Sequence, residues 1–400
     1  MTDPQNHLAA RKPATVGLLL ALTLLAVFPI DVVLPSFPAL SEQFERPSSD
    51  IALSVSLYAV GIALSQLLVG PLSDTMGRKK LLLIGITVAA IGATGCVLAD
   101  DYGSFLFYRI VQALGCGCFV LSQALIQDLF TGREQQRLRI FLVTCGGVFI
   151  SVSPLAGTGL QSWMGWRGSF LAFIALAMGV FASACLLLER STAGSRPRLN
   201  FISAYRTVCT DFSFMAYWLT SALAFSCHFS FIVISPLILI DQLHLSPEAF
   251  SLALLGYGLA YIGGGAVASV LSNRIDSQTQ IITGLGLILS AGVLMLGLSS
   301  HLGLSVTSLL LPMIVCTAGT TIARAAAHTQ AMNRFPRQAG TSASAGSVLI
   351  FIVGGLTSAA ISLTPLNLQV TLALCLVLLS LLGLELNALV RRRYRGLLTD

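Results

Sequence analysis

Residues 70–80, GPLSDTMGRKK, connect two long apolar runs of the chain. The glycine–proline pair at the start of this stretch permits close packing and predicts the end of a helix, and Gly77 allows a sharp backbone turn. Asp74 and Arg78 are four residues apart, the spacing that places two side chains on one face of a helix. Basic residues alone would suffice to orient a chain in a membrane, and that explanation requires neither the aspartate nor the glycines at these positions.

The composition of the chain excludes a soluble protein. Of its 400 residues, 55% are hydrophobic and only 10% are charged, and the mean hydropathy is +0.84. A soluble domain carries about 25% charged residues, and runs of about 20 apolar residues predict membrane-spanning helices. We therefore expect an all-α polytopic membrane protein. The nine cysteines lie mostly inside apolar runs, which predicts small buried residues rather than metal ligands.

Twelve apolar segments are long enough to cross a bilayer. Most hold about 20–24 residues, which is enough for a hydrocarbon core of about 30 Å. They lie near residues 14–35, 51–72, 80–99, 103–126, 137–160, 168–188, 214–236, 249–272, 279–299, 303–324, 341–362 and 369–390.

The basic residues are distributed unevenly between the two sides of the membrane. If the N-terminus is cytoplasmic, all of the 23 Lys and Arg residues except Arg46, Arg109 and Arg167 fall on the cytoplasmic side. This positive-inside bias predicts that both termini are cytoplasmic, and with the short loops it indicates a bacterial inner membrane. The net charge of +6 therefore reflects topology, and we expect no nucleic-acid partner.

A long polar interval divides the chain into two groups of six spans. Residues 189–212 are basic, rich in serine and interrupted by a proline. We expect an N-terminal six-helix bundle at 1–188, a cytoplasmic linker at 189–212 and a C-terminal six-helix bundle at 213–400. Two such halves are a recurring plan of secondary transporters, in which the substrate site lies near the midplane between the halves.

The loop at residues 70–80 resembles the signature of the major facilitator superfamily, G-x-L-a-D-r-x-G-r-k. Six positions are in register: Gly70, Leu72, Asp74, Gly77, Arg78 and Lys79. Thr75 stands where the family has a basic residue. In the second half, SNRIDSQTQ keeps only Arg274 and Asp276 of the pattern. The resemblance implies the twelve-helix major facilitator fold, with two pseudo-symmetric bundles, and a gating role for the loop.

Further motifs are similar to the drug–proton antiporters of this superfamily. FYRIVQALGCG in span four carries Arg109 and Gln112, and GGVFISVSPLAGTG in span five carries the recognisable motif residues Gly147, Pro154, Gly157 and Gly159. PIDVVLPSFPAL, around Asp31, resembles the start of the Bcr/CflA branch, although Val33 replaces that branch's usual tyrosine. Tyr58, and Asp128 in IQDLF, also resemble it. This branch exports bicyclomycin, chloramphenicol-type drugs and related compounds.

Asp31 is the most informative single residue. A carboxylate at bilayer depth costs about 2.5–3.5 kcal/mol on insertion scales, so such residues usually face a cavity or a partner. From Thr15 to Asp31 a helix rises about 24 Å, which places Asp31 in the outer half of span one, at a depth similar to that of Arg109 in span four. We expect the two to couple, and Asp31 to take up and release a proton. A static ion pair, or an aspartate in a water-filled vestibule, is the structural alternative.

Other candidate residues carry weaker signals. Asp128, near the cytoplasmic end of span four, is expected either to pair with a basic neighbour such as Arg133 or to act in gating. Gln112 and the aromatic residues Tyr58, Phe225 and Tyr257 are candidates for the substrate cavity, although lipid or core packing is the favoured explanation for any single aromatic residue. His228 in span seven is a packing residue or a cavity residue.

The favoured function is efflux of small amphipathic compounds in exchange for protons, by alternating access. The alternative on the same fold is a proton-coupled transporter of a metabolite or siderophore, in either direction. No Walker motif is present, so the proton gradient rather than ATP or a cofactor is the expected energy source. No motif of a hydrolase or metalloenzyme occurs, so we expect no enzymatic activity and no metal. A channel would conduct without proton coupling. We expect a monomer.

Overall fold

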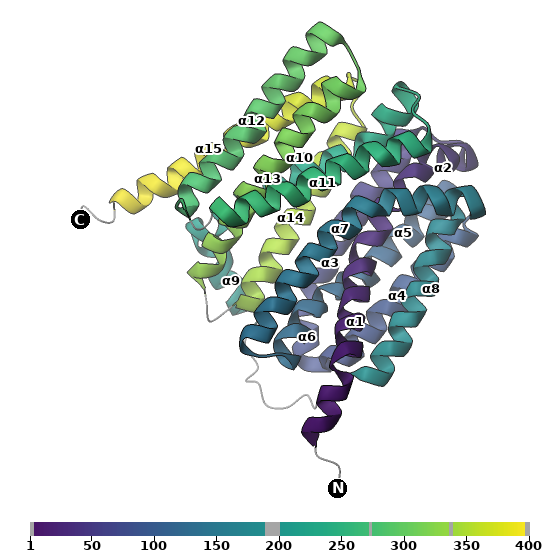
Figure 1. Ribbon diagram of the computed structural model, residues 1–400, viewed down its shortest axis with the longest axis vertical. Helices are drawn as coiled ribbons and strands as arrows, with labels where there is room; N and C mark the ends of the chain where they lie inside the picture. Colours follow the sequence, from purple (N-terminus) through teal and green to yellow (C-terminus); the bar gives the residue numbers. More distant parts are fainter. Residues whose placement is uncertain (1–3, 189–200, 272–273, 336–338, 397–400) are drawn as a thin grey trace.

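The computed structural model describes residues 4–188, 201–271, 274–335 and 339–396, and every regular element in these ranges is helical (Figure 1). Eleven helices or helix pairs are long and apolar enough to cross a membrane. The twelfth long helix is α7 (Gly132–Met164), whose residues 140–160 contain no Asp, Glu, Lys or Arg. Each predicted span overlaps one of these helices, so the predicted all-α polytopic architecture is confirmed.

The N-terminal bundle contains six crossings, two of which are interrupted. The first is α1 followed by η1 and α2, and the fourth is α5 followed by η2 and α6. Its elements are α1 (Pro4–Asp31), η1 (Leu34–Ser36), α2 (Phe37–Phe44), α3 (Ser48–Met76), α4 (Arg78–Leu98), α5 (Tyr102–Cys116), η2 (Gly117–Val120), α6 (Leu121–Leu129), α7 (Gly132–Met164) and α8 (Arg167–Leu187).

The C-terminal bundle is preceded by a short helix within the predicted linker. This helix is α9 (Phe201–Thr210), and residues 189–200 lie outside the described residues, so the predicted linker and bundle boundaries remain a prediction. The bundle contains α10 (Phe212–Pro236), the π-helical turn η3 (Leu237–Gln242), α11 (Pro247–Leu271), α12 (Ser277–Leu302), α13 (Val306–Arg334), α14 (Ala339–Ser362) and α15 (Leu368–Gly396).

Two helix pairs form the main contacts between the bundles: α3 packs on α14, and α7 packs on α11. The hydroxyls of Ser56 and Ser358 lie 2.8 Å apart across the first pair, and those of Thr158 and Ser251 lie 2.6 Å apart across the second. In Figure 1 the two bundles converge at the upper right, whereas the ends that carry the N- and C-termini point apart. Small hydroxyl side chains thus allow the halves to meet closely on the side opposite the termini.

Two helix ends differ from the prediction. The chain remains helical through residues 70 and 71, where a helix end was expected, and α3 ends only at Met76. Proline is tolerated inside membrane helices where neighbouring groups satisfy the freed backbone. The break falls at Gly77, whose φ of 86° is a conformation that favours glycine. Span ten was also expected to end at residue 324, but α13 continues to Arg334, so the half-buried Arg324 lies ten residues before the end of the helix.

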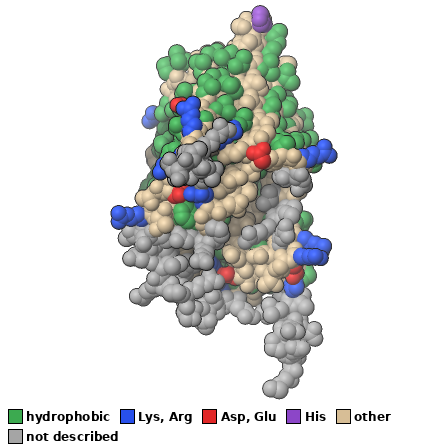
Figure 2. Space-filling view, turned by 90° about the vertical axis from the view of Figure 1, so that its left-hand side faces the viewer, with side chains coloured by type: hydrophobic (Ala, Val, Ile, Leu, Met, Phe, Trp, Pro, Cys, Tyr) green, Lys and Arg blue, Asp and Glu red, His purple; other side chains and the backbone are tan. Residues whose placement is uncertain are grey.

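The outer surface of the molecule is apolar. Many large hydrophobic side chains are exposed, including Leu68, Leu98 and Leu186 at 60%, 71% and 77%. Figure 2 shows one face on which hydrophobic side chains cover much of the upper part and charged side chains lie below. An exposed apolar area of this extent is typical of a surface that contacts lipid.

Candidate functional site

Arg109 is the centre of a buried polar cluster in the N-terminal bundle. Its side chain is only 1% exposed. One guanidinium nitrogen donates to Gln112 Oε1 at 2.8 Å, and another donates to the backbone oxygen of Pro29 at 3.1 Å. The guanidinium carbon also lies 4.4 Å from the ring centre of Tyr58 and 5.7 Å from that of Phe170. The buried cation is therefore stabilised by dipoles and aromatic faces.

The break at the end of α1 explains why Arg109 finds an acceptor there. The last four carbonyls of a helix have no partner within the helix. Because α1 ends at Asp31, the carbonyl of Pro29 is one of these groups, and Arg109 satisfies it. The α-helix ends at Asp31, and the chain continues into the 3₁₀ turn η1.

Asp31 is buried but does not pair with Arg109 in this conformation. Its side chain is 6% exposed, and its neighbours Ile30 and Val32 are buried too. Among the described residues the carboxyl group has no ion-pair or hydrogen-bond partner. The predicted coupling of the two charges is therefore not seen as a direct contact, because Arg109 bonds to Pro29 and Gln112 instead. Asp31 faces the protein interior and not the lipid.

Replacing Arg109 with alanine is expected to lower the melting temperature in detergent. The change would leave the Pro29 carbonyl and the Gln112 amide oxygen buried without a donor, which costs about 1–3 kcal/mol for each group. Arg46→Ala is the matched control, because the side chain of Arg46 is 56% exposed and lies 4.0 Å from Asp50. A melting temperature of the Arg109 variant equal to that of the control would contradict this account of the cluster.

A second buried polar cluster lies in the C-terminal bundle. His228 on α10, Tyr257 on α11 and Thr317 on α13 form a triangle of hydrogen-bonding groups. His228 Nδ1 lies 2.5 Å from the hydroxyl of Tyr257 and 3.2 Å from that of Thr317, and the two hydroxyls are 2.6 Å apart. The imidazole stacks on the ring of Tyr257 at 5.4 Å. All three side chains are buried.

Phe225 and Arg324 border this second cluster. The guanidinium carbon of Arg324 lies 4.8 Å from the ring centre of Phe225, whose ring in turn lies 6.3 Å from that of His228. Sequence reasoning missed Arg324, because it was assigned to the cytoplasmic end of span ten. It also missed Thr317. The signal for Arg324 was the apolar stretch AAA that follows it in the sequence, which allows the helix to continue.

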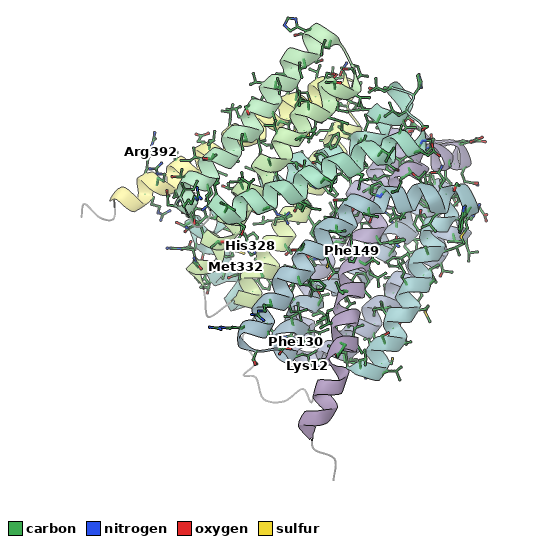
Figure 3. All side chains as sticks on the ribbon, viewed as in Figure 1. Lys12, Phe130, Phe149, His328, Met332 and Arg392 are labelled. Carbon is green, nitrogen blue, oxygen red and sulfur yellow. The ribbon has the colours of Figure 1, made fainter. Side chains whose placement is uncertain are left out.

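The candidate cavity residues thus form two groups, one in each bundle. Asp31, Tyr58, Arg109 and Gln112 belong to the N-terminal group, whereas Phe225 and Tyr257 belong to the C-terminal group. Among the described residues, no hydrogen bond, ion pair or ring contact joins the side chains of one group directly to those of the other. In Figure 3, Phe149 on α7 and His328 and Met332 on α13 lie along the boundary between the bundles in this view. The roles of the six candidates in transport remain predictions.

The structure brings two of the predicted gating residues, Arg78 and Asp128, into contact. Arg78 Nε lies 3.2 Å from a carboxylate oxygen of Asp128, so Asp128 pairs with a basic residue of the loop at residues 70–80. Arg78 also donates to the hydroxyl of Ser73 at 2.5 Å. Gly70 approaches Ser344 of α14, since a Cβ at Gly70 would lie 3.5 Å from the Ser344 hydroxyl oxygen. The side chain of Asp74 lies outside the described residues.

The equivalent stretch of the second half has a different local role. Asp276 precedes α12 and accepts hydrogen bonds from the hydroxyl of Thr279 at 2.5 Å and from the amides of Gln278 and Thr279. These donors hold the pKa of the Asp276 carboxyl below its usual value, because they stabilise its charged form. Asp276 thus caps a helix.

The span-five motif places α7 in contact with both bundles. At Gly157 an added Cβ would collide with the backbone oxygen of Val32, so α7 approaches α1 closely there. The carbonyl of Pro154 accepts a hydrogen bond from Ser251 of α11 at 3.0 Å. Gly147 faces α11, since a Cβ added at Gly147 would lie 3.5 Å from a side-chain carbon of Ile262. The three residues therefore lie where α7 packs against its neighbours in the two halves.

Twelve long helices in two bundles, each with a buried polar cluster, define a polytopic membrane protein of the transporter class. The family model described as Major Facilitator Superfamily matches residues 19–359. The chain belongs to this superfamily and is a multi-pass membrane transporter of a small-molecule substrate.

Two relatives and one solved structure show how similar the chain is to known members. It is 30% identical to a chloramphenicol resistance protein of Pseudomonas aeruginosa, over 88% of this chain and 85% of that protein. It is 25% identical to the multidrug resistance protein MdtL of Citrobacter koseri, over 81% and 82%. The crystal structure of a D-xylose–proton symporter superposes with a TM-score of 0.72 over 92% and 96% of the two chains at 16% identity, which confirms the fold alone.

Proposed function

We propose that this chain exports small amphipathic compounds, such as chloramphenicol- or bicyclomycin-type drugs, in exchange for protons. The observation that carries the proposal is the buried Asp31 carboxyl group, which lies two residues from the Pro29 carbonyl that holds Arg109. The names of relatives support the cargo, since they include a chloramphenicol resistance protein and a bicyclomycin resistance protein homolog.

Asp31 is suited to carry the proton in this scheme. A buried carboxylate without a partner is costly, so burial favours the neutral, protonated form. The position of Asp31 at the last residue of α1 adds to this preference, because the C-terminal end of a helix disfavours negative charge. In the conformation described here we therefore assign a proton to Asp31.

Arg109 stabilises the deprotonated state of Asp31 in this scheme. Its bond to the Pro29 carbonyl keeps the guanidinium near the carboxyl group without forming an ion pair. When Asp31 releases its proton to the cytoplasm, the guanidinium can move to the carboxylate and cargo can bind. After the transporter opens to the other side, Asp31 takes up a new proton and cargo leaves. Cargo and proton then compete because each binds to a different charge state of the site formed by Asp31 and Arg109. Such competition is required for exchange.

We infer that the protein lies in a bacterial inner membrane with both termini in the cytoplasm, and that it works as a monomer. The positive-inside bias of the sequence supports the orientation. The closely packed contacts of α3 with α14 and of α7 with α11 support a complete transport unit within one chain.

Uptake into inverted membrane vesicles tests the proposal. Inverted vesicles that contain the protein and have an acidic lumen should accumulate chloramphenicol. Collapse of the pH gradient should stop this accumulation. A panel of metabolites and siderophores tested in parallel separates drug export from the alternative cargo. If none of the drugs moves and one of the metabolites does, the proposed cargo is wrong.

A further inference from the structure

We propose that His228 is a fixed hydrogen-bond donor to cargo in the C-terminal bundle, and that it selects compounds with a nitro, carbonyl or carboxylate oxygen next to an aromatic ring. The inference rests on the proposed function, since it concerns the same exported compounds. It assigns the cluster of His228, Tyr257 and Thr317 a role in specificity rather than in proton coupling.

The hydrogen bonds of the cluster determine which imidazole nitrogen carries the proton. Thr317 donates its single hydroxyl proton to the Tyr257 oxygen at 2.6 Å. We assign the proton of Tyr257 to the bond with His228 Nδ1, 2.5 Å away, so that Tyr257 is the donor. This arrangement uses both hydroxyl protons, and it requires Nδ1 to be an acceptor. The neutral imidazole must therefore carry its proton on Nε2.

The other imidazole nitrogen, Nε2, is available to donate a hydrogen bond to cargo. Among the described residues, Nε2 of His228 has no hydrogen-bond partner. A second proton on Nδ1 would break the bond from Tyr257. The ionisable or charged groups facing His228 are Tyr257 and Tyr261 from α11 and Arg324 from α13, and none of them is an acid. His228 is thus a constant donor and not a pH switch.

Aromatic rings and one cation surround this donor. The rings of Tyr261 and Phe225 lie 5.1 Å and 6.3 Å from the imidazole, and Phe229 stacks on Phe225 at 5.4 Å. Arg324 lies over Phe225. Flat aromatic faces favour a planar ring of the cargo, while the N–H of His228 and the guanidinium of Arg324 favour an electron-rich oxygen.

The cluster lies next to the two main contacts between the bundles. On α14, Gly354 faces Phe225 and Phe229, whereas the adjacent Gly355 packs against α3 of the other half. A Cβ added at Gly355 would lie 2.8 Å from the backbone oxygen of Ser56. On α11, Ile262 follows Tyr261 and faces Gly147 of α7. The donor is therefore close to the boundary between the halves, where a transporter of this plan holds its substrate.

Binding of two matched compounds to the purified protein tests the inference. The probes are chloramphenicol, which has a nitro group on its ring, and the analogue in which hydrogen replaces that nitro group. We expect the wild-type protein to prefer chloramphenicol. In His228→Phe, binding of chloramphenicol should fall about tenfold, which corresponds to the loss of one buried hydrogen bond, while binding of the analogue should stay unchanged.

Two further measurements separate a donor from a packing residue. In His228→Gln, whose amide can also donate, part of the preference should return. In protein labelled with ¹⁵N-histidine, the signal that disappears in His228→Phe should show the tautomer protonated at Nε2 and should not titrate between pH 5 and 8. Tyr257→Phe should disturb that tautomer.

The outcomes distinguish the inference from the proposed function. Equal losses for both compounds in His228→Phe, an unchanged preference, or a protonated Nδ1 in the wild-type protein would overturn the role of His228 even if transport is intact. Failure of a proton gradient to drive any of the drugs into vesicles would overturn the proposed function, whereas the binding preference and the tautomer would still be measured.

Discussion

Replacing Asp31 with asparagine is expected to abolish proton-driven drug transport while the protein still inserts in the membrane. Asparagine is nearly the same size as protonated aspartic acid, so packing around the end of α1 should be kept, but the side chain can no longer bind and release a proton. Because exchange requires a change of charge at one site, uptake into inverted vesicles should no longer respond to an imposed pH gradient.

The matched control is Glu385→Gln. Glu385 is an exposed acid on the membrane-spanning helix α15, so its replacement removes an acid without touching the buried cluster. Its transport should remain close to that of the wild-type protein. Binding of chloramphenicol to Asp31→Asn, measured without a gradient, shows whether the site itself survives. Gradient-driven uptake at the wild-type rate in Asp31→Asn would defeat the assignment of the proton to this residue.

Replacing Gly258 with valine is expected to shift the protein away from the conformation described here. An added Cβ would lie 2.6 Å from the Cα of Ser151, so α11 and α7 could not approach each other as they do now. Overpacking of this kind costs about 1–3 kcal/mol, which corresponds to a shift of about 5- to 150-fold between two conformations. Transport should fall because one of the alternating states is disfavoured.

Gly256→Val provides the control on the same helix. Nothing lies within 4 Å of a Cβ added at Gly256, so this substitution makes the same chemical change without a collision. Vesicle uptake and the rate of thiol labelling of the native cysteines should change in Gly258→Val and not in Gly256→Val. Equal behaviour of the two variants would mean that close contact between α7 and α11 is not needed for transport.

The sequence determined the class of protein, the number of membrane crossings and much of the buried polar cluster around Arg109. Length and apolarity predict membrane helices because a chain in lipid must satisfy its backbone internally, and the helical structure confirms them. The residues named for the span-five motif lie at helix contacts, as glycine and proline at close approaches require. Asp31 was identified because an acid in an apolar segment is costly unless it has a function.

Only the tertiary structure decided which groups meet. Arg109 bonds the Pro29 carbonyl rather than the Asp31 carboxylate, because the end of α1 leaves that carbonyl without a partner. Thr317, Tyr257 and His228 are separated along the chain by tens of residues and meet because three helices pack together. Periodicity and composition report what each helix buries, but the partner across a helix interface depends on how the helices pack, which local sequence does not specify.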